Sequence, residues 1–374
     1  MCKQLILLAM AVTIATVLPS RSRAEEVPVE YREAIAKGLE WMARNQSKDG
    51  HWEAFGSQFP VTMTALGGMS LLMEGSTIRE GKYRDNIRRA VDWLMARSMP
   101  NGLIGNPNNP SESTRYMYGH GFAMLFLSSV VGEEEDPDRR RKLVDILERA
   151  VDFTTDAQTD RGGWGYVSAK DGGGFDEGSV TITQVQGLRA ARNAGISFDI
   201  VKGGAVKRNG EVIKRAIKYL SDSTNPRGGV IYSLAMMQGG GEGRPALTAA
   251  AISCGFSAGE HDSPLVKKWF RFCQENLRSS YGDTRIGNHD EYTYYYYAQA
   301  IYMLGDDGWA RLFPDSKEQG LKWSTFRKAS FDGIVRSQAS DGSWSGGQVG
   351  PVFITAVHLS ILQLDKAALP IYQR

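Results

Sequence analysis

Two pairs of neighbouring carboxylates are the residues of this 374-residue chain best suited by type and spacing to acid–base chemistry. Asp176 and Glu177 stand directly before the apolar stretch 179–194, whereas Asp306 and Asp307 follow another such stretch. We expect Asp306 and Asp307 in a solvated loop. Asp176 and Glu177 have two interpretations. They cap a helix start, which stabilises carboxylates, or they act as a general acid or ligand group.

Histidines are the next candidates, because imidazole serves both proton transfer and metal binding. His120 stands between two glycines at an expected helix start, where it either packs as a capping residue or faces a ligand. His289, Asp290 and His358 would form a metal site only if folding happened to bring them together. None of these residues is therefore assigned to a reaction from its type alone.

Cysteine use is sparse. Besides Cys2, the chain has Cys254 and Cys273, each within an apolar stretch. Two cysteines cannot form a structural zinc site by themselves. We expect two buried free thiols, and a disulfide between them is the alternative in an exported protein.

The elements that must position these groups come from an internal repeat. The segments 46–52, 158–164 and 338–344 are near copies of Gln-x-x-Asp-Gly-x-Trp, with weaker echoes at 98–102 and 224–229 and a degraded unit around 281–283. The spacing indicates six units of roughly fifty to sixty-odd residues. The repeat-motif residues are Gln46, Gly50, Trp52, Gln158, Gly163, Trp164, Gln338, Gly342 and Trp344.

Each unit has the pattern of two helices. The first is amphipathic, as Tyr31, Ile35, Leu39 and Met42 illustrate, and we expect the motif glycine to end it. The second is apolar on nearly all sides and must be buried. These second helices are expected near 64–72, 120–131, 179–194, 248–254, 292–304 and 352–364. Alternation of the two types predicts six exposed helices around six buried ones.

The repeat resembles the one shared by squalene and terpenoid cyclases and protein prenyltransferase β-subunits, over roughly residues 30–370. The resemblance implies an all-α fold, the (α/α)6 toroid of six helix-pair repeats, in which the motif Gln and Trp tie successive outer helices together. The chain looks most like the exported bacterial prenyltransferase/squalene-oxidase repeat proteins, a group without a settled activity. The echoes of that group are 117–121, 181–194, 350–351 and 369–372.

The chemical motifs of the superfamily are missing. Its squalene-type cyclases take their acid from Asp-x-Asp-Asp, which does not occur in this sequence. Its prenyltransferases bind zinc through Asp, Cys and His. Here Tyr292 stands at the Cys position, and Thr355 stands at the His position. We therefore predict no metal and no cofactor.

Polar residues at the inner-helix starts form the candidate ligand site, because parallel inner helices in a ring collect their N-termini at one rim. The residues that we assign to it are His120, Asp176, Thr183, Gln184, His289, Asp290, Tyr294 and His358; further polar residues expected at the rim are Thr62, Thr64, Arg244, Thr248 and Thr355. The tyrosines of 292–297 are expected to add an aromatic wall.

Two functions remain open. The first is a noncatalytic module that binds an apolar or peptidic ligand, or a partner protein, at this rim. The alternative is an enzyme with cavity chemistry, either a prenyl or terpenoid transferase or cyclase, or a polysaccharide lyase or hydrolase. The missing cyclase acid and zinc ligand favour the module.

The N-terminus has the pattern of an export signal, with Lys3, an uncharged run of 14 residues from Leu5 to Leu18, and the small residues of Ser22-Arg23-Ala24 at a cleavage site. We expect a signal peptide over 1–24, one toroid domain over 25–374, and a periplasmic or secreted protein without a transmembrane span. A retained membrane anchor is the alternative. Removing Lys3, Arg21 and Arg23 leaves 41 of the 44 basic residues against 42 acidic ones, so no nucleic-acid partner is expected.

Overall fold

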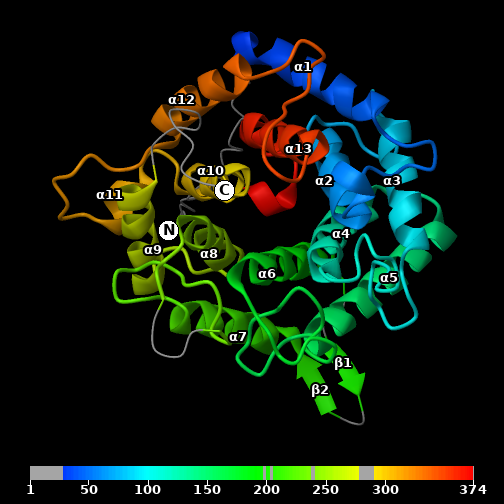
Figure 1. The fold of residues 1–374 in the computed structure, drawn as a ribbon, viewed down its shortest axis with the longest axis horizontal. Helices are drawn as coiled ribbons and strands as arrows, with labels where there is room; N and C mark the ends of the chain where they lie inside the picture. The colour runs from blue at the N-terminus through cyan, green and yellow to red at the C-terminus, as the bar shows by residue number, and fades with distance from the viewer. Residues whose placement is uncertain (1–27, 197–198, 203–204, 237–240, 278–289, 374) are drawn as a thin grey trace, which may run out of the picture.

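Two concentric rings of helices make up the computed structural model, which describes residues 28–196, 199–202, 205–236, 241–277 and 290–373 (Figure 1). The outer helices are α1 (Val29–Arg44), α3 (Arg84–Ala96), α5 (Pro137–Asp156), α7 (Asn209–Asp222), α9 (Pro264–Asn276) and α12 (Trp323–Arg336). The inner helices are α2 (Pro60–Leu72), α4 (Tyr116–Val130), α6 (Gly178–Asn193), α8 (Pro245–Ser257), α10 (Asp290–Leu304) and α13 (Pro351–Leu362). The predicted (α/α)6 toroid is confirmed.

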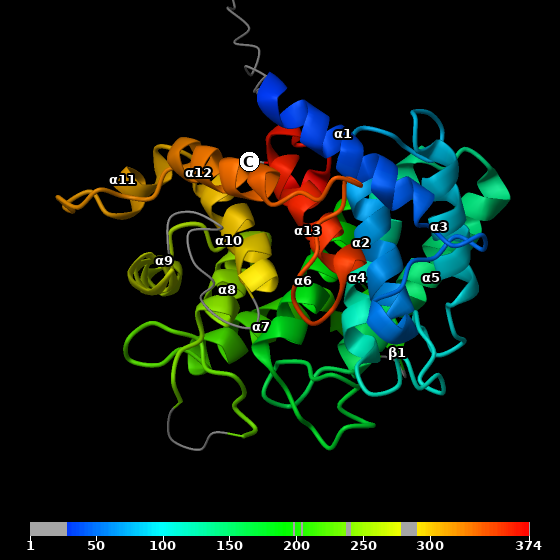
Figure 2. The same ribbon diagram turned by 45° about the horizontal axis from the view of Figure 1, so that its top comes forward.

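Hydrophobic patterning explains the two rings. Every residue of α2 is buried, as expected for a helix that is apolar all round, whereas α1 buries one face with Tyr31, Ile35, Leu39 and Met42. Each inner helix contacts the next, and α13 contacts α2, so the inner ring closes. The loops that lead into the inner helices gather on one face of the ring, the lower face in Figure 2.

Smaller elements decorate the rings. They are α11 (Gly308–Leu312), a two-stranded antiparallel hairpin of β1 (Asp199–Lys202) and β2 (Ala205–Arg208), and the short 3-10 turns η1 (Phe55–Ser57), η2 (Val131–Glu133), η3 (Leu364–Lys366) and η4 (Pro370–Tyr372). The last turn, η4, contacts α6, so the end of the described chain lies against the inner ring (Figure 1). No helix in the described part of the chain is long and apolar enough to cross a membrane.

The motif glutamines link neighbouring helix pairs. Each side-chain amide of Gln46, Gln158 and Gln338 donates to the carbonyl of its own motif glycine at 2.7–2.9 Å and to a carbonyl of the next outer helix at 2.8–2.9 Å. The acceptors in the next helix are Asn86 of α3, Val212 of α7 and Ala34 of α1, respectively. The hydrogen bond from Gln338 to Ala34 joins the loop after α12 to α1 and thereby closes the outer ring.

The motif tryptophans join the two helices of one pair. Trp52, Trp164 and Trp344 are fully buried. Each indole N–H donates to a carbonyl of the preceding outer helix at 2.7–2.9 Å, and each backbone N–H donates to a threonine of the following inner helix at 3.0–3.1 Å. The family resemblance implied a tie between successive outer helices, but these hydrogen bonds run within one unit.

The motif glycines do not end the outer helices, so that prediction is wrong. Helices α1, α5 and α12 end six residues earlier, and the glycine follows in the loop. Five glycines have φ between 90° and 104°, and a Cβ on any of them would lie 2.0–2.8 Å from a backbone carbonyl oxygen of the next outer helix. They are Gly50, Gly102, Gly162, Gly228 and Gly342. In the third unit Gly162 therefore has the role that the sequence analysis assigned to Gly163, because Gly162 has the left-handed backbone and accepts from Gln158. Close approach between units, together with the left-handed backbone, explains why glycine is needed.

A Gly162→Ala substitution tests this packing constraint. The new Cβ would lie 2.4 Å from the Arg215 carbonyl oxygen, and φ is +96°, so both backbone strain and a clash with α7 are expected. Gly259→Ala is the matched control, because its φ is +89° and a Cβ there meets nothing within 4 Å. In urea unfolding followed by tryptophan fluorescence, the control should lose about 1–2 kcal/mol from left-handed strain alone, and Gly162→Ala about 1–2 kcal/mol more. Equal losses would contradict the packing explanation.

Candidate functional site

A cavity of about 790 Å³ lies at the face where the inner helices begin. This volume is within the range of about 300–1,000 Å³ usual for small-molecule sites. Its walls come from the first turns of the inner helices and the loops before them, and they include eight aromatic residues. The aromatic lining residues are Phe55, Phe59, Tyr118, Phe122, Tyr166, Tyr232, Tyr292 and Phe353. The position of the cavity agrees with the rim expected from the sequence, but most of its lining residues were not assigned there.

A fully buried carboxyl group, Glu177, lines the cavity at the start of α6. Its oxygens accept hydrogen bonds from the backbone N–H groups of Ser179 and Val180 at 2.9 and 2.8 Å, and from the Tyr118 hydroxyl at 3.1 Å. Burial raises the pKa of Glu177, while these hydrogen bonds act in the opposite direction. Glu177 therefore caps a helix and faces the cavity at the same time.

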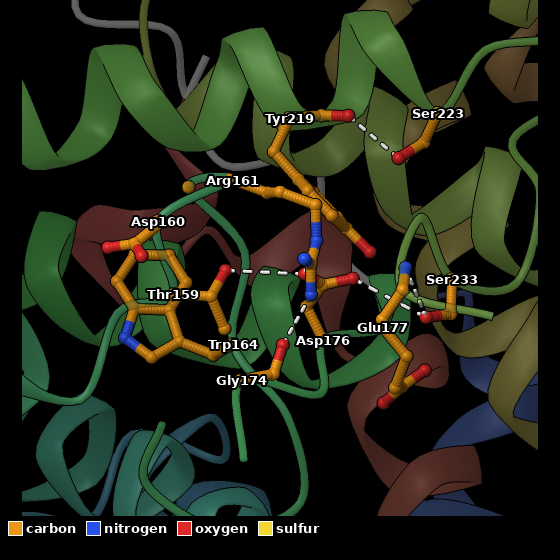
Figure 3. A network of polar contacts seen from close by, with 12 residues as sticks. Thr159, Asp160, Arg161, Trp164, Gly174, Asp176, Glu177, Tyr219, Ser223 and Ser233 are labelled. Atoms are coloured by element: carbon orange, nitrogen blue, oxygen red, sulfur yellow. Dashed lines mark hydrogen bonds and ion pairs between the residues drawn. The ribbon is translucent and has the colours of Figure 1, made fainter. Parts of the chain in front are cut away.

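Asp176 lies in a separate polar network (Figure 3). It is completely buried and accepts from the Arg161 Nε at 2.6 Å, the Thr159 hydroxyl at 3.3 Å and the Ser233 hydroxyl at 3.4 Å. In Figure 3 the Glu177 carboxylate points away from this network. Asp176 joins the loops of two consecutive units and does not line the cavity.

Two arginines line the cavity beside a pair of tyrosines. The Arg115 guanidinium carbon lies 4.6 Å from the ring centroid of Tyr166, and that of Arg244 lies 4.3 Å from the ring centroid of Tyr232. The two tyrosine hydroxyls are hydrogen-bonded to each other. We call these four residues the Arg–Tyr strip. Both arginines are exposed, and neither guanidinium forms an ion pair or hydrogen bond with another residue in the described ranges.

His120 occupies a position that belongs to the repeat. Its Nδ1 accepts the Ile104 backbone N–H at 3.1 Å, and its Nε2 lies 2.9 Å from the Thr154 hydroxyl. In four other units a threonine hydroxyl of the inner helix accepts the equivalent backbone N–H. These threonines are Thr64, Thr181, Thr248 and Thr355. His120 thus replaces a structural threonine, and complete burial lowers its pKa to about 4.

Four further assigned residues pack between helices and do not line the cavity: Thr183, Gln184, Tyr294 and His358. Gln184 donates to the Met117 carbonyl at 2.8 Å, and the Thr183 hydroxyl donates to the Val180 carbonyl at 2.8 Å. Tyr294 stacks on Phe326 of α12, with ring centroids 6.4 Å apart.

The imidazole of His358 packs edge-on against the indole of Trp344, with ring centroids 5.4 Å apart. Burial lowers the pKa of His358 to about 3. His289 and the side chain of Asp290 lie outside the described residues, as does the degraded unit around 281–283. Of the expected tyrosine wall, Tyr292 lines the cavity, and its hydroxyl donates to the Ser179 carbonyl at 3.1 Å.

Sequence reasoning missed Arg115 and the two strip tyrosines. The sequence holds a pattern that indicates both arginines, because Arg115 and Arg244 each directly precede an inner helix, α4 and α8 respectively.

Among the described residues no group of three or more His, Cys, Asp or Glu side chains could hold a metal ion. Cys254 and Cys273 are buried free thiols, as the sequence analysis expects, and burial raises the pKa of both.

Comparison with curated proteins finds one clear similarity. Human lanosterol synthase is 29% identical over 147 residues, a match that covers 37% of this chain and 19% of the enzyme. The match thus spans about a fifth of the length of that enzyme. No family model matches the chain.

Solved structures share the fold over nearly the whole chain. An α-1,6-mannanase from Salegentibacter sp. has a TM-score of 0.61 at 10% identity, covering 90% of this chain and 99% of the mannanase. The type II terpene cyclase MstE from Scytonema, bound to merosterolic acid A, has a TM-score of 0.56 at 17% identity, and the match covers 91% of this chain and 98% of the cyclase. The chain therefore has a terpenoid-cyclase-like α/α toroid, a fold that several kinds of enzyme use.

A His120→Thr variant tests whether this histidine serves the repeat. The fold keeps His120 neutral with a pKa of about 4, whereas a histidine in the unfolded chain titrates near 6.5. As the pH falls, His120 is therefore protonated in the unfolded chain before it is protonated in the folded chain. Its contribution lowers the free energy of unfolding between pH 6.5 and 4. Threonine should remove this contribution, of roughly 1–3 kcal/mol, and flatten the fall in Tm between pH 7 and 4.

The exposed His261 provides the matched control, since it is accessible in the folded protein as well. His261→Thr should keep the wild-type dependence of Tm on pH. If His120→Thr shows the same acid sensitivity as the wild type, the explanation from burial is wrong.

Proposed function

We propose that this protein is a noncatalytic binding module that takes up a small apolar ligand at the rim where the inner helices begin. The observation behind the proposal is the cavity of about 790 Å³ at that face, whose walls include eight aromatic residues. Burying an apolar ligand there would remove both the ligand and the surrounding side chains from water, which is the main driving force for such binding. Tyrosine hydroxyls at the wall would orient the ligand.

The contacts of Asp176 and Glu177 support a binding role. Asp176 is held in a network away from the cavity. The Glu177 oxygens already accept two backbone N–H groups at the start of α6 and the Tyr118 hydroxyl. A general acid must instead direct a proton towards the bound substrate. The Asp-x-Asp-Asp motif is also missing from the sequence.

An enzyme is the second candidate, and one observation favours it. Glu177 is a buried carboxyl group in the cavity wall, and burial raises its pKa, as expected for a proton donor. Terpene cyclases and mannanases are built on the same fold, so cavity chemistry is compatible with this architecture. In this reading, Glu177 would donate a proton to an alkene or a glycosidic oxygen.

Calorimetric titration with dodecanol, a neutral single-chain probe, tests the binding proposal. The wild type should bind one dodecanol per chain. Ala246→Phe should weaken binding by about tenfold or more, because the added ring would occupy the cavity that Ala246 lines. Ala235→Phe is the control, since Ala235 is exposed and lies outside the lining. Absence of dodecanol binding by a folded wild type would refute the proposal.

Incubation with two ligands of the neighbouring structures separates binding from catalysis. These are geranylgeranyl dihydroxybenzoate, bound to the terpene cyclase, and α-1,6-mannotriose, bound to the mannanase. The module should release both unchanged, as judged by mass spectrometry and chromatography. A product that the wild type forms and Glu177→Gln does not would replace the binding proposal with the enzyme.

A further inference from the structure

The Arg–Tyr strip borders one side of the cavity. Arg115 precedes α4 and Arg244 precedes α8, and α4 and α8 flank α6 in the inner ring (Figure 1). Tyr166 and Tyr232 connect them, because each ring lies against one guanidinium and the two hydroxyls are hydrogen-bonded. Residues from two different interhelical loops therefore hold the arginines in place.

Some other arginines of the fold are neutralised by carboxylates. Arg139 lies between Asp92 and Glu134, and Arg161 pairs with Asp176. Within the described part of the chain, no carboxylate pairs with either Arg115 or Arg244. Stacking on a tyrosine restrains a guanidinium while leaving its N–H edges available, so less conformational entropy is lost when an anion binds.

The surrounding charges favour an anion at this side of the cavity. Arg115 and Arg244 are the N-cap residues of α4 and α8, and the backbone N–H of Gly178 at the start of α6 donates to the Tyr232 carbonyl; helix N-termini favour negative charge. Two carboxyl groups line the cavity. Glu177 is engaged by the start of α6, and Glu291 belongs to α10, beyond α8 in the ring. An anionic group is therefore accommodated best between the two arginines.

We infer that the ligand is a single-chain anionic amphiphile, whose apolar chain fills the cavity and whose anionic head binds Arg115 and Arg244. This inference rests on the proposed function, because it assigns a chemical class to the ligand of the same cavity. Phosphate is the head group that we assign, since its several oxygens can accept hydrogen bonds from more than one guanidinium group.

Calorimetric titrations with three dodecyl probes test the inference, each below its micelle concentration at low salt. Dodecyl phosphate should bind at least about tenfold more tightly than dodecanol, and dodecyltrimethylammonium should bind no more tightly than dodecanol. The double variant Arg115→Gln/Arg244→Gln should reduce the affinity for dodecyl phosphate to that for dodecanol. Arg271→Gln is the matched control, because Arg271 also stacks on an aromatic ring, Phe313 at 4.5 Å, but lies outside the lining.

The outcomes separate the two proposals. If dodecanol and dodecyl phosphate bind equally well, the inference fails and the binding module stands. If no probe binds, both fail. A preference for phosphate that persists in the double variant also overturns the inference. Salt gives a readout that needs no variant, because added NaCl should weaken dodecyl phosphate binding to the wild type and leave dodecanol binding unchanged.

Discussion

A glutamine side chain that bonds two backbone carbonyls at once is the interaction on which this toroid depends. Gln46, Gln158 and Gln338 fix the loop of their own unit and the first turns of the next outer helix with the same amide group. The motif glycine then allows the two units to approach more closely than a Cβ would permit. Because Gln338 reaches α1, the same contact that propagates the ring also closes it.

Repetition of this junction explains where a ligand could bind. Each unit is set against its neighbour in the same way, so the inner helices begin on one face, and the cavity lies there. The arginines before α4 and α8 then meet across α6 through Tyr166 and Tyr232. The polar character of the rim is thus a consequence of ring assembly, and the two arginines give it a preference for negative charge.

The fold could be predicted because its signals are local and repeated. The spacing of Gln46, Trp52 and their copies gave the six units, and hydrophobic periodicity gave the helix types. The site could be predicted only to its face. His120 looks like a ligand residue until the structure shows that it takes the place of a repeat threonine. The Arg–Tyr strip depends on Tyr166 meeting Tyr232 across 66 residues, and no local pattern encodes such a contact.

Hydrogen–deuterium exchange of a Gln338→Leu variant tests most directly whether one junction closes the ring. The account predicts faster exchange in both α12 and α1, although these helices are about 300 residues apart, because a leucine side chain has no N–H group to donate to the Ala34 carbonyl. Gln274→Leu, on the outer surface of α9, should leave α1 protected as in the wild type. Faster exchange confined to 338–344, with α1 unchanged, would contradict the account.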